Sequence, residues 1–185
     1  MIEEFLARMK KTLPDYAEYE ACLALPPYRG VRVNTLKISA GEFQKIAPFS
    51  LGRIAWEQSG FSISEEKPGR TPYHDAGLFY VQEPSAMCAA PLLNVQPGER
   101  VLDLCSAPGG KGTQLAQAMR GRGLLVLNEK MPDRAKVLLQ NVERMGIENA
   151  VVTCADPESL AERFGGFFDK ILVDAPCSGE GMLRK

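Results

Sequence analysis

The chain has 185 residues, a length that fits one domain or one domain with a small addition. Hydrophobic residues make up 45% of it, which is ordinary for a globular protein and enough to build a core. The formal net charge of −1 excludes the strongly basic composition that would by itself point to nucleic acid, although a basic groove can lie on a neutral protein.

The first third of the chain predicts a mixture of short helices and strands. Apolar residues at helical spacing predict a helix over residues 2–13, and a second short helix is expected over 15–25. Alternating, β-branched residues predict a strand over 31–37. A short helix should begin near Ala40, and two strand-like pieces lie within residues 48–64.

A polar segment with Pro and Gly, Glu65–Pro72, predicts a linker. We therefore expect residues 1–70 to form a small α+β N-terminal lobe and residues 71–185 to form a second domain. Four basic residues of the lobe form either a solvated face or a nucleic-acid contact, and the sequence leaves both open. They are Arg29, Arg32, Lys37 and Lys45.

The second domain begins with an aromatic segment and a helix. Phe79 and Tyr80 either pack in the core, which we expect, or flank a ligand cleft. A helix should start at Glu83 or Ser85 and run to about Leu93.

The remaining chain alternates apolar strands with helices. Strands are predicted over 101–104, 124–129, 151–154 and 168–174, and the clearest helix over 133–146, with a short one over 160–164. Right-handed crossovers make this a parallel sheet in the order 3-2-1-4, with a ligand at the switch point between strands 1 and 4. An acid is expected at the end of each strand: Asp103, Glu129, Asp156 and Asp174.

A tight turn of small residues, Ser106–Gly110, follows the first of these strands. Gly109 and Gly110 have no Cβ, so the backbone can turn sharply and let a ligand approach. The helix expected from Thr113 directs free N–H groups toward that ligand. A carboxylate beside the turn, Asp103, suits a cation better than a phosphate.

Two common phosphate-binding patterns do not match this turn. A P-loop needs a glycine five residues before Gly110 and Ser or Thr after Lys111, but these positions hold Cys105 and Gly112. The pattern Gly-x-Gly-x-x-Gly also fails, because the glycines fall at 109, 110 and 112. A turn that merely links strand to helix remains the alternative.

The five cysteines lie far apart, and His74 is the single histidine, so no zinc site or other metal site is expected. An odd cysteine count without a secretory signal indicates reduced thiols and a cytoplasmic protein. No apolar run approaches the length of a membrane span.

The segment Asp103–Lys111 resembles the cofactor loop of the RNA cytosine-C5 methyltransferases, the family of bacterial 16S rRNA methylases and their eukaryotic relatives. Asp174–Gly181 resembles the second signature of that family. Arg32–Lys37 resembles part of its N-terminal lobe, and Tyr80–Met87 resembles the segment just before its first strand. The family loop usually continues Gly-Lys-Thr or Gly-Lys-Ser, whereas here Gly112 follows the lysine.

This resemblance implies a Rossmann-like methyltransferase fold that binds S-adenosylmethionine, with an N-terminal lobe that helps to hold RNA. Glu129 would accept hydrogen bonds from the ribose hydroxyls, and Asp156 one from the adenine amino group. Asp103 and Asp174 would suit the sulfonium and its amino-acid tail. The family also places Arg134 near the cofactor, although we interpret it as part of an exposed helix face. The cofactor-binding residues implied are Cys105, Ser106, Ala107, Pro108, Gly109, Gly110, Lys111, Glu129, Asp156 and Asp174.

Methylation at cytosine C5 needs a thiolate that first adds to C6. Cys177 lies three residues past the strand-end acid Asp174, and in DNA cytosine-C5 methylases a cysteine of this Pro-Cys type is the nucleophile. In the RNA family the nucleophile is a second cysteine, after the fifth strand. The resemblance therefore gives Cys177 a role in product release and makes Asp174 a catalytic residue. Cys154, Cys22 and Cys88 are expected to be buried.

Only four strands can be predicted before Lys185, whereas a complete methyltransferase sheet has seven. We therefore expect a truncated fragment that keeps the cofactor site and the lobe but lacks the nucleophile and is inactive alone. The function implied is methylation of cytosine C5 in RNA, most readily rRNA. The alternatives are a tRNA C5-methylase, a DNA cytosine-C5 methylase that uses Cys177, and a non-catalytic module that binds RNA or the cofactor.

Overall fold

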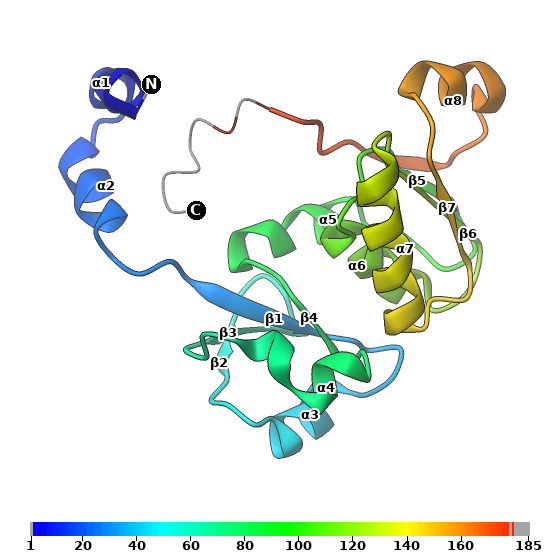
Figure 1. Cartoon of the computed structure of the whole chain (residues 1–185), viewed down its shortest axis with the longest axis horizontal. Helices are drawn as coiled ribbons and strands as arrows, with labels where there is room; N and C mark the ends of the chain where they lie inside the picture. The colour runs from blue at the N-terminus through cyan, green and yellow to red at the C-terminus, as the bar shows by residue number, and fades with distance from the viewer. Residues whose placement is uncertain (1, 178, 180–185) are drawn as a thin grey trace. The chain divides into compact units, whose positions relative to one another are not determined.

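A computed structural model describes residues 2–177 and 179. They fall into two compact units (Figure 1). One comprises Arg29–Ala175, and the other holds the segment up to Tyr28 and the described residues after Ala175. In the second unit α1 (Ile2–Thr12) and α2 (Tyr16–Leu23) confirm the two helices predicted at the start of the chain.

The larger unit begins with an antiparallel sheet of four strands. Its interior is a small aromatic core in which Phe43, Phe61 and Phe79 are each at most 2% exposed. The helix α3 (Ala40–Ile46) begins at a capping box, because Ser39 and Glu42 bond each other's backbone N–H groups. The strand order is β2 (Gly52–Arg53), β3 (Gly60–Ile63), β1 (Arg29–Val33) and β4 (Phe79–Val81).

The first strand ends at Val33, four residues earlier than predicted, because Asn34 turns the chain. The Asn34 side chain is fully buried and donates to the backbone oxygens of Gly77 and Met145 at 2.9 and 2.8 Å. Its own carbonyl accepts from the backbone N–H of Lys37 at 3.0 Å. Alternation alone could not reveal this, because the contacts come from distant parts of the chain.

The segment predicted as a linker, Glu65–Pro72, connects β3 to β4 within this one sheet. It contains a 3₁₀ turn, η1 (Pro68–Arg70), and leads into α4 (Pro72–Asp75). The domain boundary expected between residues 70 and 71 stays a prediction.

The single helix expected up to Leu93 is instead a 3₁₀ turn, η2 (Pro84–Met87), followed by a short helix, α5 (Ala89–Leu92). Pro91 has no N–H, so it cannot donate to the carbonyl of Met87 four residues earlier. That carbonyl accepts a hydrogen bond from the Gln114 side chain at 2.8 Å.

The second sheet of this unit is parallel, and its order confirms the predicted 3-2-1-4 arrangement. Three helices alternate with its strands, and α5, α6 and α7 lie along one side of it (Figure 1). Leu115 and Leu138 from these helices pack against Val101, Leu125 and Leu127 of the sheet. The elements are β7 (Ala150–Thr153), β6 (Leu124–Asn128), β5 (Arg100–Asp103), β8 (Lys170–Leu172), α6 (Gly110–Met119), α7 (Pro132–Met145) and α8 (Pro157–Phe164).

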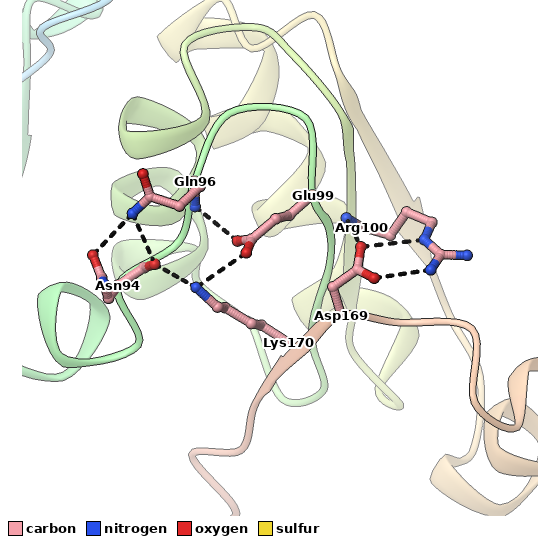
Figure 2. Close-up of polar contacts among 6 residues, drawn as sticks. All are labelled: Asn94, Gln96, Glu99, Arg100, Asp169 and Lys170. Carbon is pink, nitrogen blue, oxygen red and sulfur yellow. Dashed lines mark hydrogen bonds and ion pairs between the residues drawn. The ribbon is translucent and has the colours of Figure 1, made fainter.

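Polar contacts hold β8 to the amino end of β5 (Figure 2). The Arg100 guanidinium donates to both oxygens of Asp169, at 2.8 and 3.2 Å, and its backbone N–H donates to one of them at 2.7 Å. Lys170 pairs with Glu99 at 3.2 Å and donates to the carbonyl of Asn94. These contacts fix the register of β8, which pairs with β5 alone among the described strands.

The pKa of Asp169 is lowered to about 2 by its hydrogen bonds from Arg100. An unfolded chain titrates this carboxyl near pH ~4, so its contribution to stability is complete above that pH and is lost as the pH falls toward 2. We expect Asp169→Asn to lower the urea midpoint at pH 7, with the difference from wild type vanishing near pH 2. Urea unfolding between pH 2 and 7 measures this, with Asp133→Asn as the control. A pH-independent difference would contradict the assignment.

Candidate functional site

Residues 105–111, here called the loop, connect β5 to α6 and include the first two residues of α6; they lie at the carboxyl edge of the parallel sheet. Gly109 has φ +112°, a left-handed conformation that favours glycine, and it starts α6 three residues earlier than predicted. A Cβ at Gly112 would lie 2.5 Å from Ser106 Oγ and 2.6 Å from Leu127 Cδ2. Gly112 therefore lets α6 pack directly on the loop and on β6.

The loop is held from outside through its carbonyl groups. The backbone oxygens of Ala107, Pro108 and Gly110 all accept hydrogen bonds from side chains of β1, β4 and α7. The first turn of α6 keeps N–H groups that have no acceptor within the helix. The loop can therefore present N–H groups to a ligand. The donors to its carbonyls are Arg134 (2.8 Å), Tyr80 (3.2 Å), Asn141 (2.9 Å) and Arg32 (2.7 Å).

Asp103 ends β5 beneath this loop and is only 1% exposed. Neither of its carboxylate oxygens has a hydrogen-bond partner among the described residues, and the same holds for the Ser106 hydroxyl. Burial raises the pKa of Asp103 to about 6, and the polar Ser106 hydroxyl, the Lys111 charge and the backbone N–H of Cys105 oppose this rise without any of them making a hydrogen bond of normal length to the carboxylate. A buried carboxylate without a partner is a site that a cationic or hydrogen-bonding ligand would satisfy.

Three of the four predicted acids come together around Cys105. Burial raises the pKa of the Cys105 thiol, and the charges of Asp103, Glu129 and Asp174 raise it further. This thiol is therefore held protonated, which does not suit a nucleophile. Of these three acids, Asp103 ends its strand as predicted, whereas Glu129 and Asp174 lie one and two residues past the ends of β6 and β8.

Glu129 is the acid of this cluster whose carboxylate is both buried and bound by neighbouring groups. It is 5% exposed, accepts a hydrogen bond from the backbone N–H of Met131 at 2.9 Å, and pairs with Arg134 at 3.2 Å. Arg134 lies on an exposed part of α7, as expected, with 53% of its side chain accessible. It also joins Glu129 to the carbonyl of Ala107 in the loop.

Asp174 lies just past β8 and pairs with Lys111 of α6 at 2.5 Å. The pair connects the start of α6 to the end of β8, across the switch point between strands 1 and 4. The Asp174 side chain is 59% exposed, so solvent and a ligand can both reach its carboxylate.

Asp156 pairs with a different lysine from the one that pairs with Asp174. It stands at the start of α8 and pairs with Lys130 at 2.6 Å, with more than half of its side chain exposed. It is not among the carboxylates that act on Cys105. Its predicted contact with an adenine amino group stays a prediction.

The last residue of β6 is Asn128, a residue that the sequence analysis missed. It is 1% exposed and donates to the carbonyls of Leu104 and Ala155 at 3.1 and 3.0 Å. Its side-chain oxygen accepts from Thr153 and from the backbone of Ala155. Asn128 thus connects the ends of three strands beneath the site, and an amide closing an apolar run was the available signal.

Several predictions about individual residues were wrong. Arg32 is fully buried rather than part of a solvated or nucleic-acid-binding face. Cys22, Cys88 and Cys154 are exposed rather than buried, because α2 buries no side chain and Cys154 follows an edge strand whose Val151 is half exposed.

Cys177 is exposed and belongs to the other compact unit. Of the second signature, Ser178 and residues 180–181 lie outside the described residues.

A groove of about 1250 Å³ runs beside α6, and both polar and apolar residues line it, among them Gln114, Gln117, Phe61 and Val95. It does not include the loop or the acids around Cys105. The acids around Cys105, rather than this groove, are therefore the candidate site.

In residues 2–177 and 179, no group of three or more His, Cys, Asp or Glu side chains could hold a metal ion. None of the helices in that part of the chain has the length and apolarity of a membrane span.

Family models match nearly the whole chain. Residues 90–185 match the model described as "16S rRNA methyltransferase RsmB/F", and residues 1–84 match the N-terminal domain of 16S rRNA methyltransferase RsmF. Ribosomal RNA small subunit methyltransferase F of Aliivibrio salmonicida is 42% identical over 200 residues, and that of Enterobacter sp. is 41% identical over 196. Each alignment covers 99% of this chain but 41% of the relative, so the chain spans about two fifths of the relatives' length.

Solved structures share the fold. A methyltransferase homolog protein from Pyrococcus horikoshii is 36% identical with a TM-score of 0.77, covering 88% of this chain and 55% of that one. NSun6 from Pyrococcus horikoshii, determined with SFG, has a TM-score of 0.79 over 95% of this chain and 70% of that one. At 19% identity, the second likeness supports the fold alone.

The buried carboxyl of Asp103 predicts a specific dependence of stability on pH. Unfolded, it loses its proton near pH ~4, whereas folded it keeps the proton until about pH 6, so stability falls as the pH rises between these values. We expect Asp103→Asn to remove this fall and to raise the free energy of unfolding at pH 7 by about 1–3 kcal/mol. Chemical unfolding at pH 4 and pH 7 without ligand tests this. A variant less stable than wild type at pH 7 would show that the carboxylate is not destabilised by burial.

Proposed function

Because the chain belongs to the 16S rRNA methyltransferase RsmB/F family, we propose that it carries the S-adenosylmethionine-binding part of an enzyme that methylates C5 of a cytosine in 16S rRNA. The observation that carries this proposal is the buried carboxylate of Asp103, without a partner among the described residues and placed beneath the turn that leads into the first N–H groups of α6. The curated relatives are named for methylation of small-subunit ribosomal RNA, which favours rRNA over tRNA or DNA as the substrate. A reaction on ribosomal RNA also favours the cytoplasm.

The residues present fit this cofactor. S-adenosylmethionine, when bound, supplies a methyl group on a positively charged sulfur. The carboxylates of Asp103 and Asp174 provide negative charge for a cation with an amino-acid tail, and the Ser106 hydroxyl is available to a polar ligand atom. Residues 105–111 form the backbone cradle.

Glu129 is proposed to accept hydrogen bonds from the ribose hydroxyls. Its position about twenty residues after the glycine turn suits that role. Arg134 and the N–H of Met131 fix the direction of its carboxylate before any ligand arrives. Asp156 is proposed to contact the adenine, although Lys130 occupies its carboxylate in the present structure.

The residues that would act on the cytosine are proposals as well. A thiolate must add to C6 to make C5 nucleophilic, and a base must then remove the C5 proton. We assign Cys177 to product release rather than to this attack, and Asp174 to the catalytic face of the site. Cys105 is unsuited to the attack because burial and three acids keep its thiol protonated. The nucleophile is proposed to lie in sequence beyond these 185 residues.

Calorimetric titration with S-adenosylmethionine tests the cofactor assignment. We expect binding at pH 7.5 that weakens below about pH 6, because protonation of Asp103 removes the negative charge that a cationic ligand needs. Glu129→Gln should weaken binding about tenfold through loss of charge-assisted hydrogen bonds. The matched control is Glu99→Gln, at the opposite end of the same sheet. No heat at pH 7.5, or equal affinity in both variants, would refute the assignment.

Covalent capture separates the proposed role of Cys177 from that of a DNA-type nucleophile. The purified 185-residue chain is incubated with S-adenosylmethionine and small-subunit rRNA, or DNA, that contains 5-fluorocytosine. We expect no adduct on a denaturing gel, because the attacking cysteine is assigned outside this chain. An adduct that disappears in Cys177→Ser would instead make Cys177 the nucleophile. Methylated unmodified rRNA from this chain would overturn the expectation that it is inactive alone.

A further inference from the structure

The antiparallel sheet reaches into the candidate cofactor loop through two neighbouring residues. Arg32 on β1 and Tyr80 on β4 are directly paired across the strands. Arg32 donates to the carbonyl of Gly110 at 2.7 Å, and Tyr80 donates to that of Pro108 at 3.2 Å. Two of the three loop carbonyls bound from outside are therefore held by the antiparallel sheet.

The Arg32 guanidinium is fully enclosed and makes four contacts that define its position. It donates to the Gln82 side chain at 2.9 Å and to the Thr113 hydroxyl at 2.7 Å, in addition to Gly110. Its charge lies 5.7 Å from the centre of the Tyr80 ring. Gly110 and Thr113 are the first and last residues of the first turn of α6, so the Arg32 side chain binds both ends of that turn.

Helix stability does not account for a cation at this point. The amino end of a helix carries a partial positive charge and favours anions, so Arg32 is unfavourably placed relative to the α6 dipole. Burial adds a desolvation cost, and its hydrogen-bond acceptors are neutral oxygens rather than carboxylates. The effect of Arg32 is instead geometric, because its rigid planar guanidinium fixes Gly110 O and Thr113 Oγ1 relative to each other.

We propose that Arg32, assisted by Tyr80, is a positioning residue for the cofactor: it sets the loop and the first turn of α6 in the conformation that binds S-adenosylmethionine. This inference rests on the proposed function for the identity of the ligand. It gives the antiparallel sheet a part in cofactor binding in addition to any contact with RNA. Such a residue acts through pre-organisation, so its loss weakens binding without removing any direct ligand contact.

The test compares Arg32→Met with a matched control, Lys37→Met. Lys37 follows the same strand and also donates to two distant backbone carbonyls, those of Ala76 and Arg144, at 2.9 and 2.8 Å, but it does not touch the loop. Tyr80→Phe removes only the hydroxyl that bonds Pro108, and Arg32→Lys keeps the charge without the fork. Circular dichroism establishes the temperature range in which each variant is folded.

We expect Arg32→Met to bind S-adenosylmethionine at least tenfold more weakly than wild type in calorimetry. Arg32→Lys and Tyr80→Phe should each lose about threefold, and Lys37→Met should stay within twofold even where its unfolding temperature falls. If Arg32→Met does not fold, the affinities of Arg32→Lys and Tyr80→Phe test the proposal. Wild-type affinity in both of them would overturn the proposal.

Amide hydrogen exchange in the ligand-free protein tests the positioning role of Arg32 independently of whether the protein binds S-adenosylmethionine. Exchange in the first turn of α6, Gly110–Thr113, should be faster in Arg32→Lys and Tyr80→Phe than in Lys37→Met. Equal exchange in the three would overturn the positioning role whether or not the wild type binds S-adenosylmethionine. A wild type that binds none while showing the expected exchange pattern would refute the cofactor and leave the loop-positioning role supported.

Discussion

The site depends on how the backbone of one loop is oriented. Side chains from β1, β4 and α7 bind the carbonyl oxygens of Ala107, Pro108 and Gly110. With its carbonyls occupied in this way, the loop keeps N–H groups of the first turn of α6 for a ligand. The donors come from segments about 80 and 30 residues before the loop and about 30 residues after it, so packing of the whole unit shapes the loop together with its own glycines.

The electrostatics of the site follow from that packing. Asp103 is buried without a partner among the described residues, and its pKa rises to about 6, so the ligand-free protein holds a carboxyl that is poorly solvated at neutral pH. Glu129 and Asp174 add negative charge around Cys105, while Lys111 and Arg134 pair with them. Such an arrangement stores unfavourable energy that a cationic ligand would relieve.

Much of the fold and part of the site could be predicted from local patterns. The parallel sheet order, the helix that ends at Gly146 and the acids Asp103, Glu129 and Asp174 all follow from apolar runs and the residues that close them. Arg32 could not be predicted, because a basic residue in an alternating strand reads as solvent-facing until its partners are known. Cys154 was predicted to be buried but is exposed, because burial of a strand end depends on which strands lie at the edge of the sheet.

The sequence by itself determined the type of site: a glycine turn between a strand and a helix, with acids at neighbouring strand ends, is encoded by residues close together in the chain. Only the tertiary structure decided which side chains support that turn, because Arg32, Tyr80 and Asn141 reach it from β1, β4 and α7. Hydrogen bonds between residues 28 to 78 positions apart leave no periodic trace in a single sequence. They exist only once two sheets and a helix pack against the same loop.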